Sequence, residues 1–324
     1  ALITVRFFHG ISSAMMMPVI LAYVGDITPI GSEGLTMGLF NMAMFLGLSL
    51  GPLAGGVIKD NFGLNVSFVC MGFLALTGFL LTLFLLPPKK SEHIICSRNS
   101  VIPWKQLLKD RNIAGLYIFR FSYATCIGII WGFLPVLADS ELSLSSSSIG
   151  LLVMIGVFVS GALQLPMGYI ADKINKNAMV ITGGIISGFA IFAFDLATSF
   201  NELFTANILF GIGGSISMSA LMALAVIHGN KSKAMGSVMG MLTMAHSMGM
   251  LLGALSAGLI MDIFQLRQAF SFGSLIMIFG SVIFFICTYR KGIRGRRSEV
   301  GSQRSEVGGR RSGIRNQGSG IGDI

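Results

Sequence analysis

Charged side chains are scarce in this sequence. Asp, Glu, Lys and Arg make up 11% of the 324 residues, whereas water-soluble domains carry about 25%. Hydrophobic residues make up 53% of the chain, and its mean hydropathy is +0.78. This shortage of charge excludes a water-soluble globular protein and places the chain in a lipid bilayer.

Cysteine is also scarce, and no group of residues indicates catalysis. The four cysteines are scattered, and no pair has the spacing of metal ligands or belongs to a disulfide framework. No nucleophile–base set, metal cluster or phosphate-binding loop is recognisable. We therefore expect no enzymatic activity, no metal and no cofactor.

Long apolar runs dominate what is present. Each has about the length that a transmembrane helix needs, roughly 20 residues. They are too long for the strands of a membrane barrel, which alternate over about ten residues. An all-α membrane protein with nine transmembrane helices is predicted from the runs 2–25, 35–58, 66–87, 112–138, 148–171, 178–199, 203–227, 234–261 and 268–289.

The connections between the runs predict the orientation. Basic residues gather in 89–111, 173–176, 231–233 and 290–324. By the positive-inside rule these segments face the cytoplasm. The connection 26–33 must then be cytoplasmic too, although it has no Lys or Arg. We expect a multi-pass protein of the cell membrane with a cytoplasmic C-terminus and with Ala1 on the outer side.

The two non-membrane segments differ in character. In 89–111, Trp104, Leu107 and Leu108 share one face of a short helix, which suits the inner membrane surface. The tail 290–324 is basic and rich in Gly and Ser, so we expect it to be disordered. It can meet anionic lipid, but no folded module or aromatic platform predicts nucleic-acid binding.

The chain contains an internal repeat. Ile58 to Leu64 lines up with Ile260 to Leu266, and the same offset aligns two pairs of glycines, Gly47 with Gly249 and Gly51 with Gly253. The first three runs thus resemble the last three, a pattern typical of secondary transporters built from two related halves. Because the later half has six runs and the earlier has three, we expect the chain to be truncated before Ala1.

Gly47 to Gly56 is the most distinctive segment. Gly47, Gly51 and Gly55 share one helix face, and a glycine face lets two helix backbones approach closely in lipid. Pro52 lacks a backbone N–H, so we expect it to bend the helix. Ordinary small-residue packing is the alternative, and the ten-residue pattern makes it the less favoured one.

Three motifs together resemble the major facilitator superfamily, specifically its drug:proton antiporter branch. Gly47, Gly51, Pro52, Gly55 and Gly56 match the antiporter motif of the family's fifth helix. Arg6 to Ala14 resembles the fourth-helix motif, and Gly168 to Lys176 resembles a cytoplasmic signature, with departures at Asn175 and Asn177.

The resemblance covers about residues 1–290 and implies that the nine helices are helices 4–12 of twelve. The units would be the remaining N-terminal half (1–88), a linker (89–111), a six-helix C-terminal half (112–289) and the tail (290–324). The resemblance also implies that the fifth-helix glycine face packs against the eighth helix, which offers Gly156, Ser160 and Gly161.

Polar residues inside the runs are the candidates for proton coupling and substrate contact: Arg6, His9, Arg120, Gln164, Asn207 and His246. Ionisable groups in a bilayer are costly and usually functional, and the resemblance implies a proton-coupling role for Arg6. The alternatives are snorkelling for the arginines, hydrogen-bonded packing for the histidines, and helix-to-helix hydrogen bonds for the amides.

Gly168, Asp172, Lys173 and Lys176 form a charged turn. The resemblance implies a gate, in which Asp172 caps or pairs across the interface between the halves; simple positive-inside anchoring is the alternative. We expect a monomeric secondary transporter that exports small hydrophobic or amphipathic molecules in exchange for protons. A sugar or metabolite facilitator of the same fold, and a non-transporting membrane fragment, remain alternatives.

Overall fold

The computed structural model describes residues 2–86 and 107–288; within them, the surroundings of a few side chains, among them Arg6, Pro52 and Gly56, are not described. Its helices are α1 (Leu2–Ile27), α2 (Glu33–Phe62), α3 (Leu64–Leu85), α5 (Arg111–Ser140), α6 (Ser146–Lys173), α7 (Lys176–Leu196), α8 (Phe200–Ser232), α9 (Met235–Ile263) and a C-terminal helix, Gln268–Thr288. In this part of the chain, nine helices are long and apolar enough to cross a membrane. The predicted all-α membrane fold is therefore confirmed.

Short polar residues set the starts of the helices in the second part of the chain. Asp110, Ser145, Asn175 and Ser199 each accept a hydrogen bond from a backbone N–H in the first turn of the following helix. Those N–H groups have no partner within their own helix, so such a cap stabilises the helix start. Between α2 and α3 the chain reverses at Gly63, whose φ of 87° favours glycine.

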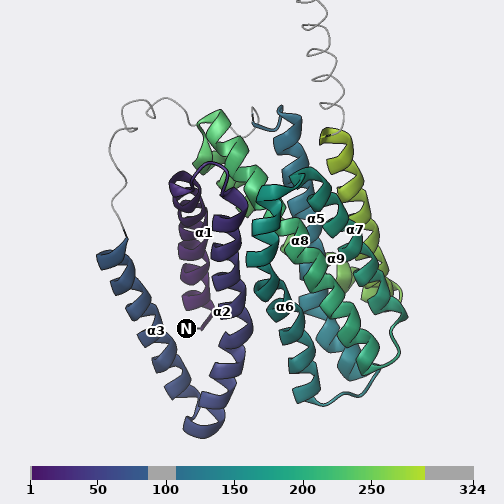
Figure 1. Cartoon of the computed structure of the whole chain (residues 1–324). Coiled ribbons are helices and arrows are strands. Elements are labelled where there is room, and N and C mark those ends of the chain that lie inside the picture. The colour runs from purple at the N-terminus through teal and green to yellow at the C-terminus, as the bar shows by residue number, and fades with distance from the viewer. Residues whose placement is uncertain (1, 87–106, 289–324) are drawn as a thin grey trace, which may run out of the picture.

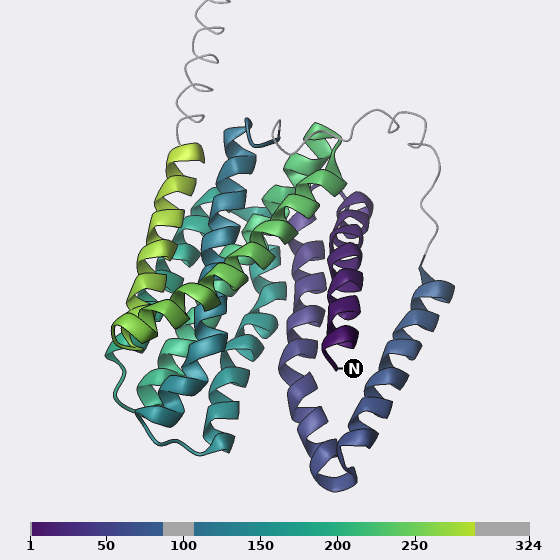
Figure 2. The ribbon, with the colours of Figure 1, turned by 180° about the vertical axis from the view of Figure 1, so that it is seen from behind.

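The helices run up and down, so their connections gather at two ends (Figure 1). At one end α1 meets α2, α6 meets α7 and α8 meets α9; we call it the Asp172 end. At the other, α2 meets α3, α5 meets α6, α7 meets α8 and α9 meets the C-terminal helix; we call it the Arg267 end. α5 to α9 and the C-terminal helix form one bundle, beside which α1 and α2 stand (Figures 1 and 2).

Helix α8 lies at the centre of the packing. It contacts α6, α7 and, more sparingly, α2, and its buried residues extend from Leu203 to Gly229. Two other extensive contacts join α5 to α9 and α2 to α6. In contrast, α3 packs mainly on α2 and has no buried residue, as expected for side chains that face lipid.

The predicted linker helix at Trp104 and the basic tail lie outside the described residues. α2 continues as one helix through Pro52, and the bend expected at Pro52 stays a prediction.

Candidate functional site

Asp172, in the last turn of α6, joins the bundle that contains α5 to α9 to helix α2 of the preceding part of the chain. Its carboxylate accepts hydrogen bonds from the backbone N–H groups of Gly34 (2.7 Å) and Leu35 (2.8 Å). These belong to the first turn of α2, where N–H groups have no intrahelical partner and the helix dipole attracts negative charge. The carboxylate of Asp172 thus completes the start of α2 across the interface, and we call this contact the latch.

Glycine makes the latch possible. A Cβ placed on Gly34 would overlap the carbonyl oxygen of Gly168, and one on Gly38 would lie 2.6 Å from the carbonyl oxygen of Gln164. A Cβ on Gly168 would in turn overlap the carbonyl oxygen of Gly34. Only residues without a Cβ let the backbones of α2 and α6 approach this closely.

The two lysines of the turn differ in their contacts. Lys176 Nζ lies 3.9 Å from a carboxylate oxygen of Asp172. Lys173 instead donates a hydrogen bond to the Tyr169 hydroxyl, with its Nζ 4.0 Å from the centre of that ring. Of the predicted turn residues, the structure therefore brings Gly168, Asp172 and Lys176 to the latch, while Lys173 covers the neighbouring tyrosine.

The antiporter-motif glycines do not form the contact expected of them. α2 does pack against α6, and a Cβ on Gly161 would lie 2.9 Å from the Cβ of Phe45. However, Cβ atoms on Gly47, Gly51 and Gly55 would meet nothing within 4 Å. The expectation that this glycine face packs on the eighth helix is wrong, because the close approach uses the earlier half of α2.

The same correction applies to two of the expected partner residues on α6. A Cβ on Gly156 would overlap the Asn207 side chain of α8, and the Ser160 hydroxyl pairs with Tyr123 of α5. Both residues therefore serve the packing of α6 on α5 and α8.

A level of polar side chains crosses the bundle near its middle. The fully buried Gln164 accepts a hydrogen bond through Oε1 from Ser219 of α8 (2.8 Å). Arg120 of α5 donates through Nη1 to the Met218 sulfur (2.7 Å). Two candidates from α5 and α6 thus reach consecutive residues of α8.

His246 adds a third helix to this polar level. It lies on α9, where the charge of Arg120 acts on it, and its buried Nδ1 has no hydrogen-bond partner among the described residues.

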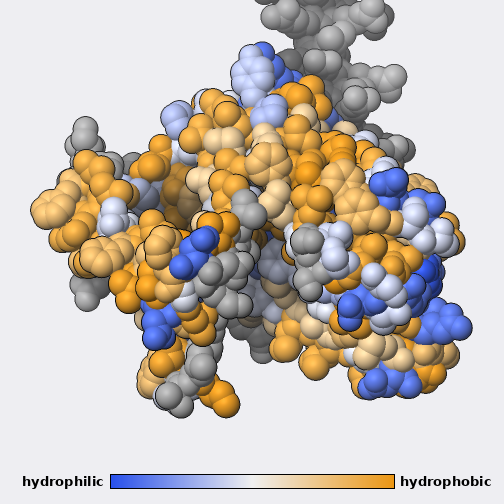
Figure 3. Space-filling view, turned by 90° about the horizontal axis from the view of Figure 1, so that it is seen from below, coloured by the Kyte–Doolittle hydropathy of each residue, from blue (hydrophilic) through white to orange (hydrophobic). Residues whose placement is uncertain are grey.

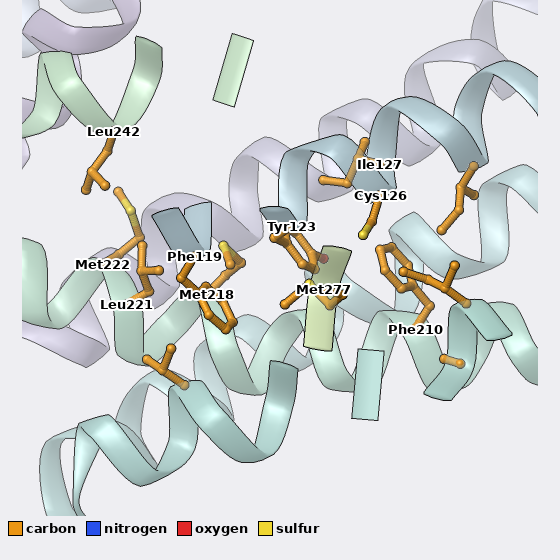
Figure 4. Packing of buried hydrophobic residues seen from close by; sticks show 14 of the residues in the cluster. Phe119, Tyr123, Cys126, Ile127, Phe210, Met218, Leu221, Met222, Leu242 and Met277 are labelled. Carbon is orange, nitrogen blue, oxygen red and sulfur yellow. The ribbon is translucent and has the colours of Figure 1, made fainter. Parts of the chain in front are cut away.

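A pocket adjoins this level on the side of the Arg267 end. Its cavity volume is about 20 Å³, and its walls come from α2, α5, α6 and α8: Phe45, Tyr123, Ile127, Ile130, Trp131, Leu134, Val153, Gly156, Val157, Ser160, Asn207 and Phe210. Tyr123 and Phe210 stack with ring centroids 5.4 Å apart (Figure 4). Seen from the Arg267 end, the surface is hollowed near its centre (Figure 3).

The remaining candidates lie apart from this level. The buried Asn207 donates to the Leu152 carbonyl oxygen, so it joins α8 to α6 while lining the pocket. His9 is exposed on α1. Arg6 also belongs to α1, and its side chain is outside the described ones.

Sequence reasoning missed Gly34, Gly38 and Ser219. The spacing of Gly34 and Gly38 places them on one helix face, but Gly47 and Gly51 have the same spacing, so the pattern alone does not identify the pair that touches. No sequence signal pairs Ser219 with Gln164. Among the described residues, no group of three or more His, Cys, Asp or Glu could hold a metal ion.

Comparison with known proteins gives a consistent result. A family model described as the Major Facilitator Superfamily matches residues 1–137 and 116–316. The chain is 29% identical over 286 residues to an MFS-type transporter of Methanocaldococcus jannaschii, covering 87% of this chain and 73% of the relative. It is 26% identical over 287 residues to Multidrug resistance protein 2 of Bacillus subtilis, covering 85% and 70%.

A solved structure shares the fold. The human organic anion transporter MFSD10 superposes with a TM-score of 0.67 at 14% identity, covering 83% of this chain and 67% of that one.

Proposed function

Because the chain belongs to the major facilitator superfamily, we propose that it works as a proton-coupled exporter of small hydrophobic or amphipathic molecules. The proposal rests on an asymmetry between the two ends of the helix bundle. The latch ties α2 to α6 at the Asp172 end, while the pocket lies toward the Arg267 end. A site closed at one end and approachable from the other is one state of an alternating-access cycle.

The pocket supports the proposed substrate class. Most of its walls are aliphatic or aromatic, with a few polar groups such as Ser160 and Asn207. Such walls bury apolar surface, and sparse polar groups orient a ligand. Three relatives of this chain carry names that begin with Multidrug resistance protein, at 26%, 22% and 23% identity.

Proton coupling is proposed on the titratable groups within the membrane helices. His246 belongs to the polar level, beside Arg120, and ionisable groups within membrane helices are usually functional. His9 and Arg6 on α1 are the other candidates. We further propose that the protein is a monomer of the cell membrane, with the Asp172 end facing the cytoplasm.

Reconstitution of the chain in proteoliposomes tests this function. Rhodamine 6G is the probe, a pH gradient is the only driving force, and empty liposomes are the control. We expect uptake that requires the gradient and stops when a protonophore collapses it. Uptake that persists without any gradient would contradict proton coupling. The absence of rhodamine 6G uptake above the level of empty liposomes would favour a non-transporting fragment.

A further inference from the structure

Arg120 is the charged side chain of the polar level, and its partner there is weak. Its hydrogen-bond partner among the described residues is the Met218 thioether, and thioether sulfur is a poor acceptor. Lys176 pairs with Asp172 and Arg267 with Glu141, and Tyr123, not a described carboxylate, is the group whose charge acts on Arg120. A guanidinium inside a membrane protein normally pairs with a negative group, and this one is left with donors to spare.

Two further side chains at this level have an unused polar atom. Gln164 Nε2 is buried and has no acceptor among the described residues, although Gln164 Oε1 is bonded to Ser219. His246 Nδ1 is likewise buried without a partner in the described part of the chain, close enough to Arg120 to feel its charge. Buried polar groups without partners are rare and need an explanation.

The helix geometry places Arg120 and Gln164 at one depth. Tyr123 of α5 and Ser160 of α6 are hydrogen-bonded to each other. Arg120 lies one turn from Tyr123 and Gln164 one turn from Ser160, and because α5 and α6 are antiparallel both turns lead toward the Asp172 end. Their side chains end at the neighbouring residues Met218 and Ser219 of α8. The two side chains therefore lie at the same depth of the bundle.

The apolar pocket begins one helix turn away from these donors. Tyr123 and Ser160 line it, one turn nearer the Arg267 end than Arg120 and Gln164. A molecule with an acidic head and an apolar body would match this order of groups, with the head toward Arg120 and Gln164 and the body toward the apolar walls of the pocket.

We propose that Arg120 and Gln164, with His246 beside them, form a subsite for the carboxylate of an amphipathic organic acid. The subsite deepens the proposed function, on which it rests, by naming organic anions among the amphipathic molecules that the protein takes. A carboxylate matches the guanidinium in charge and can accept two of its N–H groups at once.

Equilibrium binding of a matched pair of ligands tests the subsite. The chain is placed in phosphatidylcholine nanodiscs at pH 7, and radiolabelled naphthalene-1-acetate is compared with the neutral naphthalene-1-acetamide, with empty nanodiscs as background. We expect the acid to bind about tenfold more tightly, the size of one charge-assisted hydrogen bond. Equal affinities for acid and amide would overturn the proposal.

Substitutions at Arg120 and Gln164 show which residues cause the preference for the acid over the amide. Arg120→Gln should lower the affinity for the acid about tenfold and leave that for the amide unchanged, while Arg120→Lys retains part of the preference. Gln164→Glu should weaken acid binding as well, because a second carboxylate repels it. A preference for the acid that survives both Arg120→Gln and Gln164→Glu would overturn the subsite.

Ser187→Ala is the matched control. Ser187 Oγ is also buried without a described partner, but it lies on α7 against Gly213, on another face of α8, so this variant should keep the preference. Thermal unfolding of each variant shows that it is folded. Displacement of the acid by added phosphatidylglycerol would assign the subsite to a lipid headgroup and overturn the proposal.

These measurements need no gradient. Absence of gradient-driven uptake would therefore contradict the proposed function and leave the binding result intact. Equal binding of acid and amide would overturn the subsite and leave gradient-driven uptake intact.

Discussion

The repeat places two glycine pairs in equivalent positions of α2 and α9, and their surroundings are opposite. On α9, Cβ atoms at Gly249 and Gly253 would meet backbone atoms of α5, at 2.5 Å from the Phe121 carbonyl oxygen and in overlap with that of Thr125. On α2, Cβ atoms at Gly47 and Gly51 would meet nothing within 4 Å. The same spacing thus serves a tight helix pair in one place and an open face in the other.

The difference shows that glycine spacing alone does not tell whether a second helix packs on that face. α5 covers α9 within one bundle, whereas the described part of the chain offers α2 no equivalent helix at Gly47 and Gly51. α2 makes its close contact with α6 in its first half, at Gly34 and Gly38, where the latch lies. We infer that α5 and α9 form a fixed pair, and that α2 and α6 form the contact that opens and closes.

The largest effect is expected from Gly253→Ala. The new methyl group overlaps the Thr125 carbonyl oxygen, and overpacking of this kind costs about 1–3 kcal/mol. We expect a lower midpoint of thermal unfolding in detergent.

Gly258→Ala on the same helix is the control. Its Cβ would meet only Phe133 Cζ, at an ordinary 3.7 Å, and alanine favours a helix over glycine by about 1 kcal/mol. Equal midpoints for the Gly253 and Gly258 variants would show that α9 does not pack on α5 as described.

The smallest effect on stability is expected from Gly51→Leu. The Cβ of the new side chain would meet nothing within 4 Å, and leucine favours a helix over glycine, so the free energy of unfolding should rise by no more than about 1 kcal/mol. If the motif acts in transport, as the resemblance implies, uptake in proteoliposomes should nevertheless fall. Unchanged uptake would reduce the motif to ordinary small-residue composition, and a large loss of stability would show that α2 is covered at this point.

The sequence was sufficient for some features and insufficient for others, for physical reasons. The nine helices follow from hydrophobic run length, which the bilayer dictates. The contact of Asp172 across the interface was expected from the family resemblance and is seen in the structure, although its role as a gate stays a proposal. Which glycines touch, and that Ser219 meets Gln164, depend on the rotation and separation of helices distant in sequence, and no local pattern encodes these.

The most direct test of the account is whether the latch closes the Asp172 end of the pocket. Val157, which lines the pocket on α6, is replaced by cysteine in a chain without its native cysteines. An impermeant maleimide is then applied to sealed vesicles of either orientation, with and without Asp172→Ala, which removes a cap worth about 0.5–2 kcal/mol. The account predicts labelling from the Arg267 end alone with Asp172 present, and labelling from the Asp172 end as well in its absence. Labelling from the Asp172 end with the latch intact, or an unchanged pattern without it, would contradict the account.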